Sequence, residues 1–287
     1  MDHRSFFGLQ EHLERLSEIG DPLEVLDATV DFEYFRDWLL DGLGYGDGAR
    51  GGRPPYDPVS MFKVLILQAQ HNLSDAKMEF MLQDRLSWMR FAGFDLGQKT
   101  PDENTIRLFR NKLTESGALK RVMKAFDWQL KKKGYLPMSG QIVDASLVAA
   151  PKQRNTDDEK RDLKAGRVPE AWKKKPARLR QKDRDARWTV KFSKAKVGPD
   201  GKVQRDIAVP TFGYQDHISI DRRYRLIRRW QATDAAAYEG RMLRRGLLDK
   251  SNTASLVWAD TAYRSKANEH FMEQHGFVSQ VHRKKIL

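Results

Sequence analysis

The chain has 287 residues, enough for one large domain or two, and its 40% hydrophobic content is sufficient for a core. The absence of cysteine excludes disulfides, a thiolate zinc site and a cysteine nucleophile, and no apolar run predicts a membrane span or a signal peptide. We therefore expect a soluble cytoplasmic protein. Its formal net charge of +13 favours a polyanion such as nucleic acid as partner over a merely solubilising surface.

Residues 1–135 are predicted to be helical. Apolar side chains recur at helical spacing in five stretches: 9–16, 32–39, 61–69, 106–113 and 116–132. A glycine-rich run over 42–55 is expected to interrupt these helices.

The polar residues that flank these stretches predict where the helices begin and end. Asp57, which precedes a proline, and Ser74 are expected to be N-caps. Thr100 and Glu103 have the spacing of a capping box. The last helix is expected to stop at Gly134 after a run of three lysines.

After Tyr135 the pattern changes to alternating strands and helices. We expect a buried strand over 141–148, a hairpin of 212–220 and 224–232, a helix from Thr233-Asp234 to about 248, a strand over 255–260, a helix over 265–275 and a strand over 277–282. This order predicts an α/β sheet in which a hairpin lies beside parallel strands. The whole chain is therefore expected to have an α+β or α/β fold with an all-helical N-terminal part.

Residues 152–206 form a basic insert within this second half. It carries 19 Lys and Arg against nine Asp and Glu, a net +10 of the chain's +13, and its prolines oppose long regular elements. The cluster that we expect to bind phosphates is Lys173, Lys174, Lys175, Arg178 and Arg180; a solvated loop is the alternative. Trp172 and Trp188 lie in the insert and either stack on bases or pack in a core.

Two acids suggest a site for chemistry. Asp144 lies inside an apolar strand, where an unpaired carboxylate is costly, and Asp260 ends the other apolar strand, at the edge where α/β sheets bind ligands. If the strands are neighbours, the two carboxylates could share Mg²⁺, and two such ions could clamp the oxygens of a phosphodiester displacement. In the alternative, Asp144 pairs with an arginine and Asp260 only caps the following loop.

Several motifs taken together resemble those of bacterial DDE transposases, most closely the insertion-sequence-five family. In the second half they are Gln141–Ser146, Phe212–Asp221, Leu226–Arg229, Ala232–Ala235 and Val257–Ser265. In the first half they are Pro54–Tyr56, Leu65–Leu67 and Pro101–Ile106. The resemblance covers nearly the whole chain, and its motifs are specific in combination.

The resemblance implies a helical DNA-binding domain at 1–135 and a ribonuclease H-like DDE domain at 136–287. It places Asp144 and Asp260 on the first two catalytic acids and implies two Mg²⁺ ions in a complete site. In such enzymes a water nicks the end of the element, and the freed 3′-hydroxyl then attacks target DNA. The implied partners are double-stranded DNA, at transposon ends and target, and further copies of the chain, with the protein on the nucleoid when bound.

This sequence departs from the family pattern at the third acid. The family's glutamate lies on a helix beyond the last strand, and this sequence stops at Leu287. Glu269 and Glu273 point away from the apolar face of their predicted helix, and Glu239 has no better support. We therefore expect a truncated transposase with impaired catalysis. The alternatives are a non-catalytic DNA-binding protein that inhibits transposition, and a nuclease of the same fold.

Other residues near the two acids allow two interpretations each. Tyr263 and Arg264 follow Asp260 and either contact the DNA backbone or have an ordinary loop role. His217 is expected to be a structural histidine rather than one that orients a carboxylate. In the first half, 74–90 and 101–113 are expected to form a helix-turn-helix-like reader of the element ends.

Overall fold

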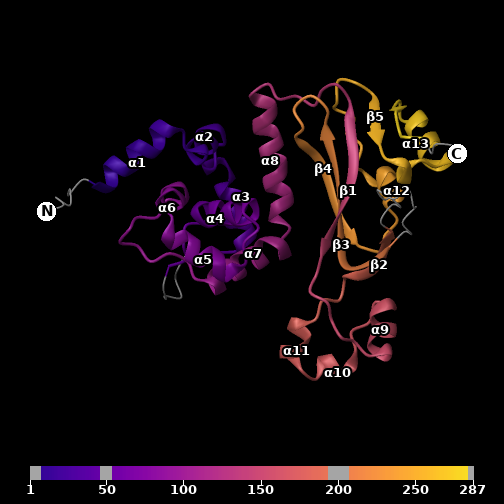
Figure 1. Ribbon diagram of the computed structural model, residues 1–287, viewed down its shortest axis with the longest axis horizontal. Coiled ribbons are helices and arrows are strands. Elements are labelled where there is room, and N and C mark those ends of the chain that lie inside the picture. The colour runs from indigo at the N-terminus through magenta and orange to yellow at the C-terminus, as the bar shows by residue number, and fades with distance from the viewer. Residues whose placement is uncertain (1–7, 46–53, 193–206, 284–287) are drawn as a thin grey trace, which may run out of the picture. The chain divides into compact units, whose positions relative to one another are not determined.

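The computed structural model describes residues 8–45, 54–192 and 207–283. The chain divides into two compact units, Met1–Tyr135 and Leu136–Leu287. Helices make up the first unit, and a mixed sheet with shorter helices makes up the second (Figure 1). The fold is thus α+β. None of the helices in the described ranges is long and apolar enough to cross a membrane.

The helices of the first unit share one core. They are α1 (Gly8–Ile19), α2 (Pro22–Thr29), the 3-10 turn η1 (Glu33–Phe35), α3 (Arg36–Leu43), α4 (Pro58–Gln70), α5 (Asp75–Asp84), α6 (Leu86–Ala92), α7 (Glu103–Glu115) and α8 (Ala118–Lys132). Residues predicted from helical spacing, such as Leu39, Met61 and Ile106, are fully buried in this core. The expected interruption at 42–55 separates α3 from α4, and 46–53 lie outside the described residues.

Side-chain caps set where several of these helices begin. Asp57 and Ser74 each accept a backbone N–H of the first turn, which confirms both predicted caps. The capping box predicted for Thr100 and Glu103 is wrong. The helix begins two residues later, with Asp102 as its N-cap, whose carboxylate accepts a first-turn N–H at 2.7 Å. Aspartate caps at least as well as threonine, and Thr100 is instead buried.

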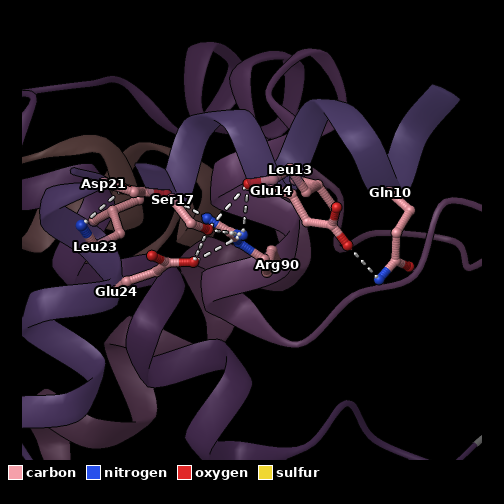
Figure 2. A network of polar contacts seen from close by, with 8 residues as sticks. All are labelled: Gln10, Leu13, Glu14, Ser17, Asp21, Leu23, Glu24 and Arg90. Carbon is pink, nitrogen blue, oxygen red and sulfur yellow. Dashed lines mark hydrogen bonds and ion pairs between the residues drawn. The ribbon is translucent and has the colours of Figure 1, made fainter. Parts of the chain in front are cut away.

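Arg90 of α6 ties the end of α1 to the start of α2 (Figure 2). Its Nη2 donates to Asp21 Oδ2 at 2.8 Å, and its Nη1 lies 2.8 Å from Glu24 Oε1. The same Nη1 donates to Ser17 Oγ and to the carbonyl of Leu13. One guanidinium thus satisfies acceptors from two helices, which fixes the turn between them.

The second unit is built on a six-stranded sheet. Its strands are β1 (Gln141–Ala149), β2 (Arg187–Phe192), β3 (Ala208–Asp221), β4 (Ile227–Asp234), β5 (Leu256–Ala259) and β6 (Val278–Ser279). The order is β2-β3-β1-β5-β6, with β4 also paired to β3. The β3–β4 hairpin is antiparallel, whereas β1, β5 and β6 are parallel neighbours, which confirms the predicted hairpin beside parallel strands.

β3 is longer than its neighbours and belongs to two parts of the sheet (Figure 1). Its first residues pair with β2, in what we call the ribbon (187–192 and 208–213), and its later residues pair with β1 on one side and β4 on the other. Gly213 stands at the junction. A Cβ there would lie 2.1 Å from the carbonyl oxygen of Val148, so only glycine allows β1 and β3 to approach this closely.

The basic insert contains short helices and one strand, although its prolines were expected to oppose long regular elements. These are α9 (Asp157–Lys164), α10 (Glu170–Lys173), α11 (Pro176–Gln181) and β2, whereas 193–206 lie outside the described residues. Glu159 contacts all three helices of the insert. It closes a capping box with Thr156 at the start of α9. Its carboxylate also accepts the Nε1–H of the fully buried Trp172 at 2.6 Å and pairs with Arg178 at 2.9 Å. The insert therefore has a small polar core of its own.

The helices after the hairpin are shorter than predicted. They are α12 (Glu239–Met242), the 3-10 turns η2 (Leu243–Arg245) and η3 (Thr261–Tyr263), and α13 (Lys266–Gln274). The prediction that Thr233-Asp234 caps a helix is wrong, because both residues extend β4 by pairing with β3. Ser265 does cap α13, as predicted, and the strand predicted for 277–282 is reduced to β6.

Candidate functional site

Asp144 and Asp260 occupy neighbouring positions on two parallel strands. β1 and β5 are paired in parallel, and their last pair in register joins Val143 to Ala259. Asp144 is the next residue of β1, and Asp260 directly follows the end of β5. Because side chains alternate between the two faces, both acids lie on the face opposite to the buried Val143 and Ala259. The structure therefore brings the two predicted acids together.

Both carboxylates are exposed and have one anchored oxygen each. Asp144 Oδ1 accepts the N–H of Ala145 at 2.8 Å, and Asp260 Oδ1 accepts the N–H of Ala262 at 2.9 Å. The prediction that the strand is buried around Asp144 is wrong, because only the alternate positions of its first half face the core. Among the described residues, no Lys or Arg forms an ion pair with either acid, although Asp260 does cap η3.

The chemistry of this pair fits a hard divalent cation. Carboxylate oxygens are the donors that Mg²⁺ prefers, and it is commonly held by one or two carboxylates together with waters and substrate phosphates. Within the parts of the chain that the structure describes, no three His, Asp or Glu residues are grouped so as to hold an ion by themselves. Asp144 and Asp260 are the residues here whose oxygens could serve as ligands for such an ion.

Tyr263 is fully buried in η3, close to this pair. Burial raises the pKa of its hydroxyl, and the charges of Glu239, Asp144 and Asp260 raise that pKa further. The hydroxyl has no hydrogen-bond partner among the described residues. The expected contact of Tyr263 with the DNA backbone does not agree with this position, because the side chain does not reach the surface.

Glu239 is a third acid whose charge, like those of Asp144 and Asp260, acts on Tyr263, and its position was not apparent from sequence. It begins α12, where its Oε1 accepts from Gln215 Nε2 at 3.0 Å and pairs with Lys191 of β2 at 2.7 Å. The helix is held against η3 by Tyr238, whose hydroxyl donates to the carbonyl of Ala262 at 2.9 Å. No sequence pattern reports such packing between α12 and η3.

The two glutamates of α13 are not grouped with the aspartates. Glu269 accepts from Ser279 Oγ at 3.1 Å and lies 3.7 Å from Arg264, and Glu273 is exposed. Arg264 itself is half-buried and donates to the carbonyl of Val281 at 3.0 Å. Its guanidinium therefore braces the segment after β6, which is the loop role weighed against contact with DNA.

His217 is fully buried on β3 and has the structural role expected of it. Its Nε2 lies 2.8 Å from Thr233 Oγ1 of β4, whereas Nδ1 has no partner among the described residues. Burial lowers the pKa of His217, although the nearby charges of Glu239 and Asp216 act in the opposite direction.

The basic cluster of the insert is mostly open to solvent. Exposed members are Lys173, Lys174, Lys175 and Arg180. Arg178 is half-buried and bound to Glu159, so part of its charge is already neutralised within the insert. The two tryptophans differ in burial. Trp172 packs in the polar core of the insert, and Trp188 is exposed on β2.

In the first unit, the two helical stretches expected to form a DNA reader are α5–α6 and α7. Arg110 of α7 forms a bidentate ion pair with Asp75, the first residue of α5, at 2.6 and 2.9 Å, and also donates to Gln68. The pair lowers the pKa of Asp75, chiefly through the hydrogen bond from Arg110. The helices are thus held together by a specific polar contact.

Comparison with known proteins concerns mainly this first unit. No solved structure matches the chain. Residues 11–112, from α1 into α7, match the family model described as Transposase domain (DUF772), and this similarity supports a transposase family for the chain.

Proposed function

We propose that this chain is a DNA transposase of an insertion sequence, of the insertion-sequence-five family, with a helical DNA-binding unit at 1–135 and a ribonuclease H-like DDE unit at 136–287. The observation that carries the proposal is that Asp144 of β1 and Asp260, directly after the paired strand β5, are exposed and free of basic partners among the described residues. The transposase-domain similarity over 11–112 supports it independently.

Asp144 and Asp260 would hold Mg²⁺ together with a phosphate of the DNA. Bound there, the ion would stabilise charge on the phosphate and lower the pKa of an attacking water. The backbone N–H groups of Ala145 and Ala262 hold one oxygen of each carboxylate and so orient the other oxygen. Tyr263 is buried near the pair and feels the charge of both carboxylates.

The reaction proposed is phosphodiester hydrolysis followed by strand transfer. The oxygen of a water molecule bonds to phosphorus while the bond to the 3′-oxygen breaks, which leaves a 3′-hydroxyl on the element end and a 5′-phosphate on the flanking DNA. That 3′-oxygen then attacks a phosphorus of target DNA and displaces another 3′-oxygen. The substrates are duplex DNA ends and target, brought together by more than one copy of the chain on the nucleoid in the cytoplasm.

A nicking assay tests this proposal. The full chain is incubated with Mg²⁺ and a supercoiled plasmid that carries the reading frame with its flanking DNA. Asp144→Asn and Asp260→Asn should each lower nicking at least about 100-fold, because a carboxylate ligand is replaced by a neutral amide of the same shape. Glu170→Gln, which changes an exposed acid of the insert, is the matched control. Nicking that survives both aspartate changes contradicts the proposal.

A non-catalytic DNA-binding protein that inhibits transposition is the second candidate. It is favoured by the fact that no third acid joins the two aspartates in a metal-holding group within the described ranges. In the same assay it would bind the plasmid without nicking it, whereas nicking that depends on Asp144 excludes it.

A further inference from the structure

One face of β2 presents a row of apolar side chains to solvent. Trp188, Val190 and Phe192 alternate with more polar residues, so all three lie on the same face, which we call the stacking face. Their exposed fractions are 49%, 51% and 64%. β2 stands at the end of the strand order and pairs only with β3 in the described part of the sheet. Exposed apolar rows of this kind mark interaction surfaces.

The neighbouring strand holds this face in position. Phe212, Pro210 and Ala208 of β3 lie directly opposite the three residues and therefore on the same face. The ring of Trp188 leans on that of the buried Phe212, with centroids 5.5 Å apart at 45°. Trp188 is thus supported from one side, while Phe192 has no ring contact in the described residues. Four residues of strand place the Cα atoms of Trp188 and Phe192 about 13 Å apart.

One positive charge is placed beside the stacking face. Lys152 Nζ lies 5.9 Å from the centroid of the Trp188 ring, and Arg154 and Arg184 are exposed in the segments that lead to and from the helices of the insert. Two acids, Asp183 and the exposed Asp185, lie in the same segment, and the Asp183 carboxylate accepts the Tyr214 hydroxyl and two backbone N–H groups. Lys152 beside the Trp188 ring, on a chain with a net charge of +13, favours a polyanion over a second copy of the same positively charged chain.

We propose that the stacking face binds unpaired bases of DNA, with Trp188 and Phe192 against the flat faces of the bases and Lys152 near the backbone. Aromatic rings within a basic groove are the means by which proteins hold single strands, because every base has a π-face. A duplex hides those faces within its stack, so the site selects DNA that has been opened or frayed. The inference rests on the proposed function only in taking DNA as the polyanion.

Binding measurements with two single strands of equal length test this. One is an oligothymidylate labelled at its end, and the other is the same sugar–phosphate strand without bases, so charge is constant and only stacking differs. The unchanged full chain should bind the thymidylate more tightly. Phe192→Leu, which keeps apolar bulk and loses the ring, should weaken thymidylate binding between about fivefold and a hundredfold and leave the abasic strand unaffected.

Matched variants keep the test clear of folding effects. Phe192→Tyr retains the ring and should bind as the unchanged chain does, and Thr189→Val changes a residue of β2 outside the stacking face and should cause no loss. Trp188→Phe should keep most of the affinity, since it retains both the ring and the support of Phe212.

The results that overturn the inference are distinct from failure of the proposed chemistry. Equal affinity for the two strands, or no effect of Phe192→Leu, overturns it. A change of oligomeric state on Phe192→Leu in sedimentation assigns the face to a second copy and also overturns it. A base preference that depends on Phe192 supports it, even in a chain that fails to nick DNA.

Discussion

The indole Nε1 of Trp172 donates to Glu159 Oε1 at 2.6 Å in the middle of the basic insert, where both residues are buried. Burial alone would raise the pKa of Glu159, but the hydrogen bonds from Thr156 and Trp172 and the charge of Arg178 outweigh it, so its pKa is lowered. The charge of the insert is therefore displayed by a folded element rather than by a loose loop.

Trp172→Phe should loosen the insert. The change removes the indole donor and leaves a buried carboxylate oxygen with one partner fewer, which costs about 1–3 kcal/mol. Hydrogen exchange of the backbone amides of α9, α10 and α11 measures the effect, and we expect exchange there to accelerate while β1 and β5 keep their protection. Trp230→Phe, a partly exposed tryptophan on β4, is the control. Equal exchange in both variants would contradict a polar core at Glu159.

Gly213→Ala should destabilise the second unit by at least about 2 kcal/mol, because the added Cβ would meet the Val148 carbonyl at 2.1 Å and backbone would have to move. Chemical denaturation followed by circular dichroism measures the free energy of unfolding. Gly97→Ala is the matched control, since nothing lies within 4 Å of its Cβ position. A Gly213→Ala protein as stable as the control would show that β1 and β3 are farther apart than described.

Stability should fall as the pH drops below about 6.5, in part because of His217. Its pKa is lowered in the folded chain, so the unfolded chain takes up a proton that the native chain refuses. His217→Asn should therefore flatten the dependence of unfolding free energy between pH 7 and 5, by up to about 1.4 kcal/mol per pH unit. The exposed His270→Asn is the control. An unchanged slope in His217→Asn would mean that another group is responsible.

Duplex binding should weaken steeply with salt, as phosphate contacts by the exposed lysines would require. Each phosphate contact contributes about −0.9 to the slope of log K against log salt concentration. Lys174→Gln should reduce the steepness by about one contact, whereas Lys160→Gln should not, because Lys160 is paired with Asp157 at 2.8 Å. Fluorescence anisotropy of a labelled duplex at several salt concentrations gives the slope. A shallow slope for the unchanged chain would exclude the insert as the contact surface.

Much of the first unit could be predicted from local pattern. Helical spacing identified core residues such as Leu39 and Ile106, and Asp57 and Ser74 were recognisable as caps. The cap predicted at Thr100 was wrong because Asp102, two residues later, is the N-cap of this helix. Local signals of this kind suffice where a helix depends on its own ends and on one apolar face.

The second unit depended more on contacts between distant segments. Residues 141–148 read as a buried strand because they are apolar on both sides of Asp144, yet only alternate positions are covered. Thr233 carries a capping pattern that strand pairing overrides. The two tryptophans of the insert look alike in sequence, and only the placement of Glu159 decides that Trp172 is buried while Trp188 is not.

We predicted that Asp144 and Asp260 could come together if their strands are neighbours. β1 and β5 are paired, so this condition is met. The nearness of Glu239 was not predictable, since it depends on how α12 packs on η3. Whether Asp144 and Asp260 hold a metal stays a prediction until it is measured.

The unbroken course of β3 has a geometric consequence for any DNA that the protein handles. Backbone pairing at the Phe212–Gly213 junction joins the ribbon to the sheet: Ala149 pairs with Gly213, and the N–H of Ala150 donates to the carbonyl of Phe212. Ala208 lies opposite Phe192, and Ile218 lies opposite Asp144, ten residues farther along. At strand rise that span is about 33 Å, close to one turn of B-form DNA. Under the two proposals made above, a base bound at Phe192 would lie about one helical repeat along β3 from a phosphodiester bond held at Asp144 and Asp260.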